Sequence, residues 1–377
     1  MGPLEGVKVV EFAGIGPAPI VGMLLADLGA QVVLIERKVM NSNAATVDPT
    51  LMGKAAFFKR GKKSITLNLS KCSDVEAALS LVAKADVLVE GFRPGVMERL
   101  GIGPEVCLEK NPKLIYGRMT GWGQTGPLAP SAGHDLNFSA ITGALFYGGL
   151  PGDIPFPTPT LQGDVGGGSM SLALGILSAL FHVNKTGQGQ VIDAAISDGV
   201  IYNMMLLASL REQGVISDGD RNDFFSGAAP WCSTYRCADD RFVTVQALEP
   251  NFYQKLVSIC GFSDDPDFVD QYDKSCWQIA KTKMSAFFGS RTQAECCSLL
   301  EGTDACFAPI LNFSEAANHP HNQARESFIR IDGVLQPAPA PKFSLTKQVV
   351  GSIPDLGEHN DNILGPLGLY NKSNLSD

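Results

Sequence analysis

The stretch from Val7 to Glu36 reads VKVVEFAGIGPAPIVGMLLADLGAQVVLIE, and it indicates the class of fold. It opens and closes with β-branched apolar runs that have the length and composition of buried strands. Between these runs lie a Gly/Pro-rich loop, a segment with helical spacing at residues 20–28, and Gly29 as a helix stop. A strand, a loop, a helix and a second strand form the unit of a doubly wound, Rossmann-like α/β sheet.

The loop of this unit also contains part of a dinucleotide-binding pattern. Gly14 and Gly16 have the spacing of its first two glycines, and Glu36 stands where an acidic residue would bind a ribose. However, Pro19 occupies the position of the third glycine, and Pro17 stiffens the turn. We therefore interpret the loop as a tight turn of an α/β fold, with an NAD-dependent oxidoreductase kept as a minor alternative.

The same alternation of strands and helices continues along the chain and predicts a parallel sheet. Further strands are expected at residues 64–69, 86–90, 114–119 and 191–195. Ligands of such sheets bind at the carboxyl ends of the strands. The loops at residues 13–19, 91–95 and 120–127 are therefore expected to line one cleft.

The length of 377 residues suits two domains. A composition shift at residues 211–224 predicts a linker between them. We expect a large α/β domain, residues 1–210 completed by 325–377, and a smaller α+β domain at residues 225–320. The small domain is expected to contain a β-hairpin near residues 235–246, followed by helices up to about residue 304.

Composition restricts the partners and the compartment. A net charge of −9 argues against nucleic acid as a partner. No apolar run reaches the roughly 18 residues of a membrane span, and no targeting signal is recognised. The nine cysteines show no metal-like spacing, which predicts reduced thiols and no metal site. A cytoplasmic location is expected, with the peroxisome and the mitochondrion left open.

Three side chains could perform acid–base chemistry. His134, one of five histidines, stands in A-G-H-D, and Asp164 stands in G-D-V-G-G-G at the start of a long apolar helix predicted over residues 165–182. Glu249 follows in L-E-P-N-F-Y. A histidine and a carboxylate can both be tuned to transfer protons at neutral pH. From position alone, Asp164 also fits a helix N-cap, and Glu249 fits a surface residue at a strand end.

Several motifs carry a resemblance to a known family. They are R-M-T-G-W-G-Q-T-G-P (118–127), A-G-H-D-L-N (132–137), L-Q-G-D-V-G-G-G (161–168), G-Q-G-Q-V-I-D-A-A (187–195) and L-E-P-N-F-Y (248–253). In this order they resemble the α-methylacyl-CoA racemases of the family III CoA-transferase superfamily (CaiB/BaiF type). The resemblance runs from about residue 4 to about residue 360.

The resemblance implies a cofactor-independent isomerase that interconverts 2R and 2S acyl-CoA thioesters through an enolate. His134 and Asp164 would be the two acid–base groups, and Glu249 would orient His134 across the interface of an interlocked homodimer. The groups implied to contact the CoA moiety are Arg37, Lys59, Arg60, Lys62, Lys63, Arg93 and Gly133. Trp231 and Cys232 depart from the family pattern, and we expect them to alter the acyl pocket.

The same resemblance keeps one further reaction open. In a family III CoA-transferase, Asp164 would act as a nucleophile and form anhydride and thioester intermediates while CoA moves between carboxylic acids. That reaction needs the aspartate alone, whereas a two-base epimerase also needs His134. The presence of both favours the epimerase.

Overall fold

A computed structural model describes residues 1–37, 52–219 and 221–367, which form two compact units. The first unit comprises Met1–Gly143, Thr158–Asn203 and Glu326–Asp377, and the second comprises Ala144–Pro157 and Met204–Arg325. The boundaries differ from those predicted. Residues 144–157 and 204–210 group with the second unit, and so do the residues of the predicted linker.

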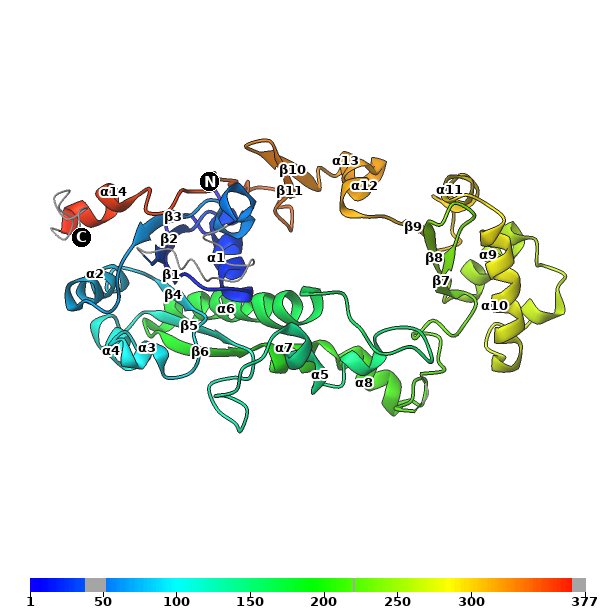
Figure 1. The fold of residues 1–377 in the computed structure, drawn as a ribbon, viewed down its shortest axis with the longest axis horizontal. Helices are drawn as coiled ribbons and strands as arrows, with labels where there is room; N and C mark the ends of the chain where they lie inside the picture. Colours follow the sequence, from blue (N-terminus) through cyan, green and yellow to red (C-terminus); the bar gives the residue numbers. More distant parts are fainter. Residues whose placement is uncertain (38–51, 220, 368–377) are drawn as a thin grey trace. The chain divides into compact units, whose positions relative to one another are not determined.

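The first unit is built on a six-stranded sheet of order β3-β2-β1-β4-β5-β6, in which every pair is parallel (Figure 1). Its strands are β1 (Lys8–Phe12), β2 (Gln31–Glu36), β3 (Lys63–Thr66), β4 (Val87–Glu90), β5 (Ile115–Thr120) and β6 (Gln190–Ala195). In register, Val9 of the central strand β1 pairs with Val32 on one side and Val87 on the other. This order is that of a doubly wound sheet, which confirms the predicted fold class.

Helices flank this sheet. They are α1 (Pro17–Asp27), α2 (Cys72–Val82), α3 (Val96–Arg99), α4 (Pro104–Lys110), α5 (Asp135–Ala140), a π-helix (Leu161–Ser169), α6 (Met170–Thr186), α7 (Ile196–Asn203) and α14 (Asn360–Leu364). One core cluster joins Val10 and Leu88 of the sheet to Ala78 of α2 and Leu364 of α14. Helices α1 and α6 contact each other, and α1 contacts β1 while α6 contacts β5. The β1–α1 turn thereby lies at the carboxyl end of β1, where the site is formed.

The π-helix and α6 form one continuous helical stretch, Leu161–Thr186. Within the described ranges, it is the one helix that is long and apolar enough, by length and composition, to cross a membrane. The sequence analysis expected no such segment. Leu172 and Ile176 of this stretch are fully buried, and both contact Gly117 of β5. These contacts are those of a helix that covers the sheet.

The C-terminal part of the chain returns to the first unit. It forms a hairpin of β10 (Phe328–Ile331) and β11 (Val334–Pro337), followed by α14 and a short 3₁₀ helix, Gly365–Leu367. The side chain of Asn360 is hydrogen-bonded to the edge strand β3: the backbone N–H of Thr66 donates to its Oδ1 at 2.8 Å, and its Nδ2 donates to Thr66 Oγ1 at 2.9 Å. This edge of the sheet is therefore covered.

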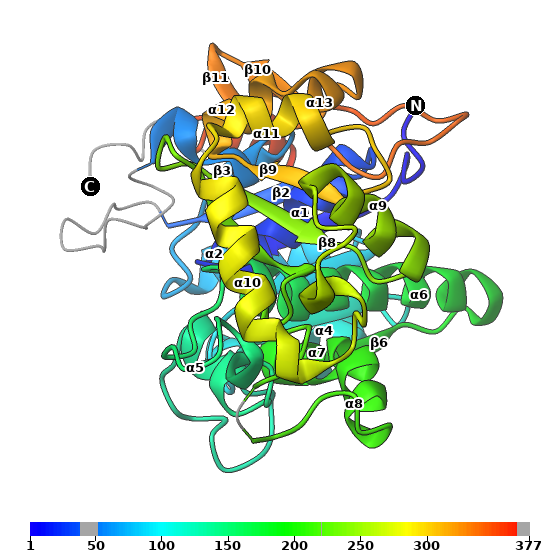
Figure 2. The same ribbon diagram turned by 90° about the vertical axis from the view of Figure 1, so that its right-hand side faces the viewer.

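The second unit has a three-stranded antiparallel sheet of order β7-β8-β9. Its elements are α8 (Met205–Glu212), β7 (Cys232–Arg236), β8 (Phe242–Gln246), α9 (Pro250–Cys260), α10 (Lys274–Gly289), α11 (Gln293–Leu300), β9 (Phe307–Ile310), α12 (Phe313–Asn318) and α13 (Pro320–Ala324). Helix α10, which is labelled in Figure 1 and in Figure 2, packs against β7. Trp231 is buried in this core and donates its indole N–H to Gln271 O at 2.8 Å. Trp231 and Cys232 are thus core residues of the second unit, and their effect on an acyl pocket stays a prediction.

Candidate active site

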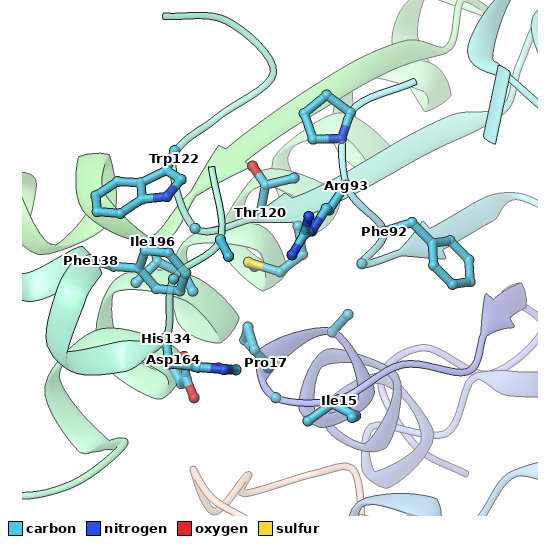
Figure 3. A pocket seen from close by; sticks show the side chains of 18 of the residues that line it. Ile15, Pro17, Phe92, Arg93, Thr120, Trp122, His134, Phe138, Asp164 and Ile196 are labelled. Atoms are coloured by element: carbon cyan, nitrogen blue, oxygen red, sulfur yellow. The ribbon is translucent and has the colours of Figure 1, made fainter. Parts of the chain in front are cut away.

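A cavity of about 300 Å³ opens at the carboxyl ends of the parallel strands (Figure 3). Its wall is formed by residues 15–18 after β1, 91–94 after β4 and 119–122 at the end of β5. The three loops predicted to line one cleft therefore do so. Residues 129 and 131–134, together with Phe138, Asp164 and Ile196, complete the wall. All of these residues belong to the first unit.

His134 is the N-cap residue of α5 and lies on the cavity wall. Its backbone N–H donates to Asn137 Oδ1 at 3.0 Å, which fixes the start of the helix. The preceding residue, Gly133, packs against an aromatic pair in which the rings of Trp122 and Phe138 meet edge to face at 4.8 Å. A Cβ atom at Gly133 would lie 2.6 Å from the Phe138 ring, so only glycine lets the loop pass here. His134 itself is exposed to the cavity.

Asp164 lies in the first turn of the π-helix, not at the N-cap of an α-helix as its position suggested. The N-cap residue is Thr160, whose φ of 63° is left-handed. Of the three glycines at positions 166–168, Gly167 and Gly168 are buried. A Cβ atom on Gly167 would lie 2.6 Å from Val200 Cγ2. Gly167 therefore allows close packing against α7. This π-helix is nine residues long, and π-helical geometry next to an α-helix is frequent at functional sites.

The environment of Asp164 favours its neutral form. Burial and, second, the negative charge of Asp135 raise the pKa of Asp164 to about 6, against an opposing effect of His134. Figure 3 shows His134 and Asp164 beside each other at one end of the cavity. A carboxyl group with this pKa can both donate and accept a proton near neutral pH.

The loop after β4 is held by a buried ionic network. Glu90 is fully buried, and its Oε2 accepts the backbone N–H of Phe92 at 2.7 Å. Arg118 of β5 pairs with Glu90 at 2.9 Å and with Glu98 at 2.7 Å. This network fixes the backbone on either side of residue 91, and the exposed side chain of Arg93 lines the cavity from there.

Three of the basic residues predicted to contact CoA have other partners in the structure. Each is buried and forms an ion pair with a carboxylate of the same unit. The pairs are Lys59–Glu36 at 3.0 Å, Arg60–Asp27 at 2.5 Å and Lys62–Glu11 at 2.6 Å. Their cationic groups stabilise the core, which corrects their predicted role on phosphates. Arg37, Lys63 and Arg93 are exposed.

Glu249 is part of the second unit, whereas His134 and Asp164 are part of the first. It is the N-cap residue of α9, and Pro250 occupies the first position of that helix. The side chain of Glu249 is exposed and makes no capping hydrogen bond. Its carboxylate is therefore free to bind another group.

Possible metal ligands and the cysteine thiols are further features of the chain that concern its chemistry. Across residues 1–37, 52–219 and 221–367, no group of three or more His, Cys, Asp or Glu side chains is arranged to hold a metal ion. The nine cysteines are free thiols, and five of them are buried.

One residue of the site was missed by the sequence analysis. Asp135 follows His134 directly, and its Oδ1 accepts the backbone N–H of Asp164 at 2.8 Å. Its adjacency to a candidate histidine was the available signal. Its contact with a residue 29 positions later could not be read from the sequence, because no local periodicity connects the two.

This fold and site define the class of the protein. The chain matches the model of CoA-transferase family III over residues 4–360, and it belongs to that family. Within it, the chain is 40% identical to the alpha-methylacyl-CoA racemase of Mus musculus over 97% of this chain and 93% of the mouse protein. It is 38% identical to the alpha-methylacyl-CoA racemase of Homo sapiens, with the same coverage of both chains.

A solved structure is similar over the whole chain. The crystal structure of a CAIB/BAIF family protein from Brucella suis superimposes with a TM-score of 0.85 at 27% identity. The match covers 97% of this chain and 99% of the bacterial one. Both comparisons agree with the resemblance found in the motifs.

Proposed function

We propose that the protein is an isomerase that interconverts the 2R and 2S forms of 2-methylacyl-CoA thioesters. The observation that carries the proposal is the placement of His134 and Asp164 in the wall of one cavity, with a pKa of about 6 for Asp164. The similarity to racemases over nearly the whole chain supports the same substrate class.

The reaction needs one base, one acid and no change of oxidation state. In one direction neutral His134 takes the α-proton of the thioester, and the electron pair of the C–H bond moves into an enolate. Protonated Asp164 then delivers its proton to the opposite face of the α-carbon. The enzyme is left with a protonated histidine and an ionised aspartate, which is the form that performs the reverse reaction. No cofactor takes part in these steps.

The CoA moiety requires positive charge outside the core. We assign its phosphates to the exposed residues Arg37, Lys63 and Arg93, of which Arg93 lines the cavity. The backbone at Gly133, which has no side chain to obstruct it, would lie along the thioester arm. This assignment omits the three cations that are paired in the core.

We further propose a homodimer in which Glu249 of one copy orients His134 of the other. The free carboxylate of Glu249 supports this role. Helices α6 and α7 also expose large apolar side chains, among them Leu174, Phe181 and Tyr202, on a surface that a second copy would cover. An active site shared between copies would exist only in the dimer.

Co-expression of two inactive variants tests this arrangement. A His134→Ala chain and a Glu249→Ala chain, carrying different tags, would form mixed dimers with one intact site and one doubly altered site. Mixed dimers purified through both tags should regain about half of the wild-type activity. If both residues served the same subunit, the mixed dimers would stay inactive.

The epimerase itself is tested by proton NMR in D₂O. The 2R and 2S forms of a 2-methylacyl-CoA are incubated separately, and loss of the α-proton from both, with convergence on one mixture, is expected. His134→Ala and Asp164→Ala should each abolish convergence, whereas His182→Ala, which removes an exposed histidine on α6, should not.

The alternative reaction, transfer of CoA between carboxylic acids, rests on Asp164 alone. It would show as movement of CoA to an added free acid with no loss of the α-proton. That result, with full activity retained in His134→Ala, would replace the epimerase by a CoA-transferase.

A further inference from the structure

We infer that Asp135 is a positioning residue for proton transfer: it fixes the backbone that carries Asp164 and keeps Asp164 able to act as an acid. The inference rests on the proposed function and extends it to a residue outside the cavity wall. It is carried by the hydrogen bonds between α5 and the π-helix, and by the packing around them.

Both carboxylate oxygens of Asp135 accept backbone N–H groups at the start of the π-helix. Oδ1 accepts from Asp164 at 2.8 Å, and Oδ2 accepts from Thr160 at 3.2 Å. The first N–H groups of a helix have no partner within the helix, so these two bonds satisfy donors that would otherwise be unpaired. They also hold Thr160, whose left-handed backbone begins the helical stretch.

The contact is tightly packed. A Cβ atom on Gly163 would lie 2.2 Å from Asp135 Oδ1 and 2.9 Å from Ser139 Oγ. Only glycine therefore allows the π-helix to approach α5 this closely. Since Asp135 is also the residue after His134, one side chain fixes the spacing between the two acid–base groups.

The charge of Asp135 also acts on Asp164. After burial, it is the largest cause of the raised pKa of Asp164, and His134 acts in the opposite direction. Among the described residues, Asp135 and His134 are the charged side chains that act on the pKa of Asp164. At Gly167 and Gly168 the π-helix contacts Ile196, Val200, Pro17 and Met119. Several ionisable groups on the elements packed against the π-helix are exposed: Asp198 and Tyr202 of α7, Asp193 of β6, and His182 and Lys185 of α6. The others are buried and have partners: Asp27 of α1 pairs with Arg60, Arg118 of β5 pairs with Glu90 and Glu98, and Tyr116 of β5 donates to Ile102 O.

Asp135 is not itself an acid–base group in this scheme. It does not line the cavity, and both of its oxygens are occupied by backbone donors. Its effect reaches the substrate through the position and the protonation of Asp164.

The test replaces Asp135 by asparagine, which keeps the shape, removes the charge and leaves only one acceptor oxygen. In wild type and in Asp135→Asn, selective ¹³C labelling of aspartate carboxyls would report the titration of Asp164, identified by the signal missing from Asp164→Asn. We expect the pKa of Asp164 to fall in Asp135→Asn. The limb of the rate profile that the titration of Asp164 sets should move to lower pH, and kcat should drop about 10- to 100-fold with little change in KM.

Ser139→Ala is the matched control. The Ser139 hydroxyl is buried beside the same glycine and has no hydrogen-bond partner among the described residues, so its removal changes the packing but not the charge. It should leave the titration of Asp164 unchanged. An unchanged titration in Asp135→Asn together with a rate within twofold of wild type would overturn the inference.

Two measurements distinguish a failure of this inference from a failure of the proposed function and from misfolding of the variant. The titration is made without substrate, so it judges Asp135 even if the wild type were to prove inactive as an epimerase. If Asp135→Asn does not fold, amide hydrogen exchange of the intact wild-type protein decides. The N–H groups of Thr160 and Asp164 are expected to be protected, and rapid exchange at both would refute the inference.

Discussion

Replacing Lys62 by methionine should destabilise the protein without acting on CoA directly. The Lys62 side chain is fully buried, and its Nζ lies 2.6 Å from one oxygen of Glu11 and 2.8 Å from the other. The same ammonium group donates to Pro19 O at 2.8 Å, at the start of α1. A phosphate ligand could reach it only if these bonds were broken.

The magnitude follows from leaving a buried carboxylate without its partner. Removing one member of a buried ion pair costs about 3–5 kcal/mol. Burial already raises the pKa of Glu11 to about 7 with Lys62 present, so without Lys62 the carboxyl group would take up a proton near neutral pH. This uptake relieves part of the cost, and we expect about 3 kcal/mol at pH 7.

The pH dependence has a definite sign. A carboxyl group whose pKa in the folded state lies above its unfolded value stabilises the fold at low pH and loses that contribution as pH rises through the folded pKa. The destabilisation caused by Lys62→Met should therefore be larger at pH 8 than at pH 5.5. Such a dependence would identify Glu11 as the group left without a partner.

Thermal unfolding at a fixed protein concentration is the assay, because association shifts the melting temperature. A loss of 3 kcal/mol should lower it by about 6–12 °C in a unit of this size. The control is Lys63→Met, which alters the next, exposed residue and should change stability by less than about 0.5 kcal/mol. A double variant, Glu11→Gln with Lys62→Met, should be more stable than Lys62→Met alone. Unchanged stability with a tenfold loss of CoA affinity in Lys62→Met would refute the reasoning.

Three further predictions concern the cavity. Asp164→Asn should raise the free energy of unfolding by about 1 kcal/mol at pH 8, after allowance for solvent screening. The reason is that the pKa of Asp164 is raised to about 6, so its ionisation opposes folding. Denaturant titration should show that this gain vanishes near pH 4. Gly163→Ala should lower the rate and cost about 1–3 kcal/mol by displacing Asp135, whereas Gly365→Ala, with open space around its Cβ, should change the melting temperature little. Arg93→Met should raise the KM for an acyl-CoA about tenfold with unchanged melting, and an unchanged KM would remove Arg93 from the CoA site.

The sheet could be predicted from the sequence because buried parallel strands are apolar runs. The strands at residues 7–12, 31–36, 86–90 and 114–119 were expected within a residue or so of where β1, β2, β4 and β5 lie. Their runs are bounded by loops rich in glycine and proline, so local composition sufficed. The cleft followed from the same reasoning, since carboxyl ends of parallel strands meet at one edge.

The basic run at residues 54–63 could not be interpreted in the same way. The resemblance implied that its residues contact CoA, yet Lys59, Arg60 and Lys62 are buried in the core. Their partners lie 23 to 51 positions earlier in the chain, and only the order of the sheet brings them together. Composition reports the number of charges and not their pairing.

The site was predicted in part. His134 and Asp164 were identified from their motifs, and the structure brings both to one cavity. The π-helix was not expected, because its start depends on Thr160 in a left-handed conformation and on acceptors from α5. The packing of Gly167 against α7 could not be predicted for the same reason, because this contact is tertiary.

The buried ion pair and the catalytic candidates are connected through the start of α1. Lys62 donates to Pro19 O, and two residues earlier Pro17 O accepts a hydrogen bond from the hydroxyl of Ser169 at 3.0 Å. Ser169 ends the π-helix that carries Asp164, and Asp135 holds the beginning of the same helix. An aspartate kept partly neutral inside a protein needs such support, because its burial disfavours the charged form and its backbone has no regular α-helical bonds to hold it. Lys62→Met should therefore lower the rate even at temperatures where the variant is fully folded, through the position of α1 and not through the binding of CoA.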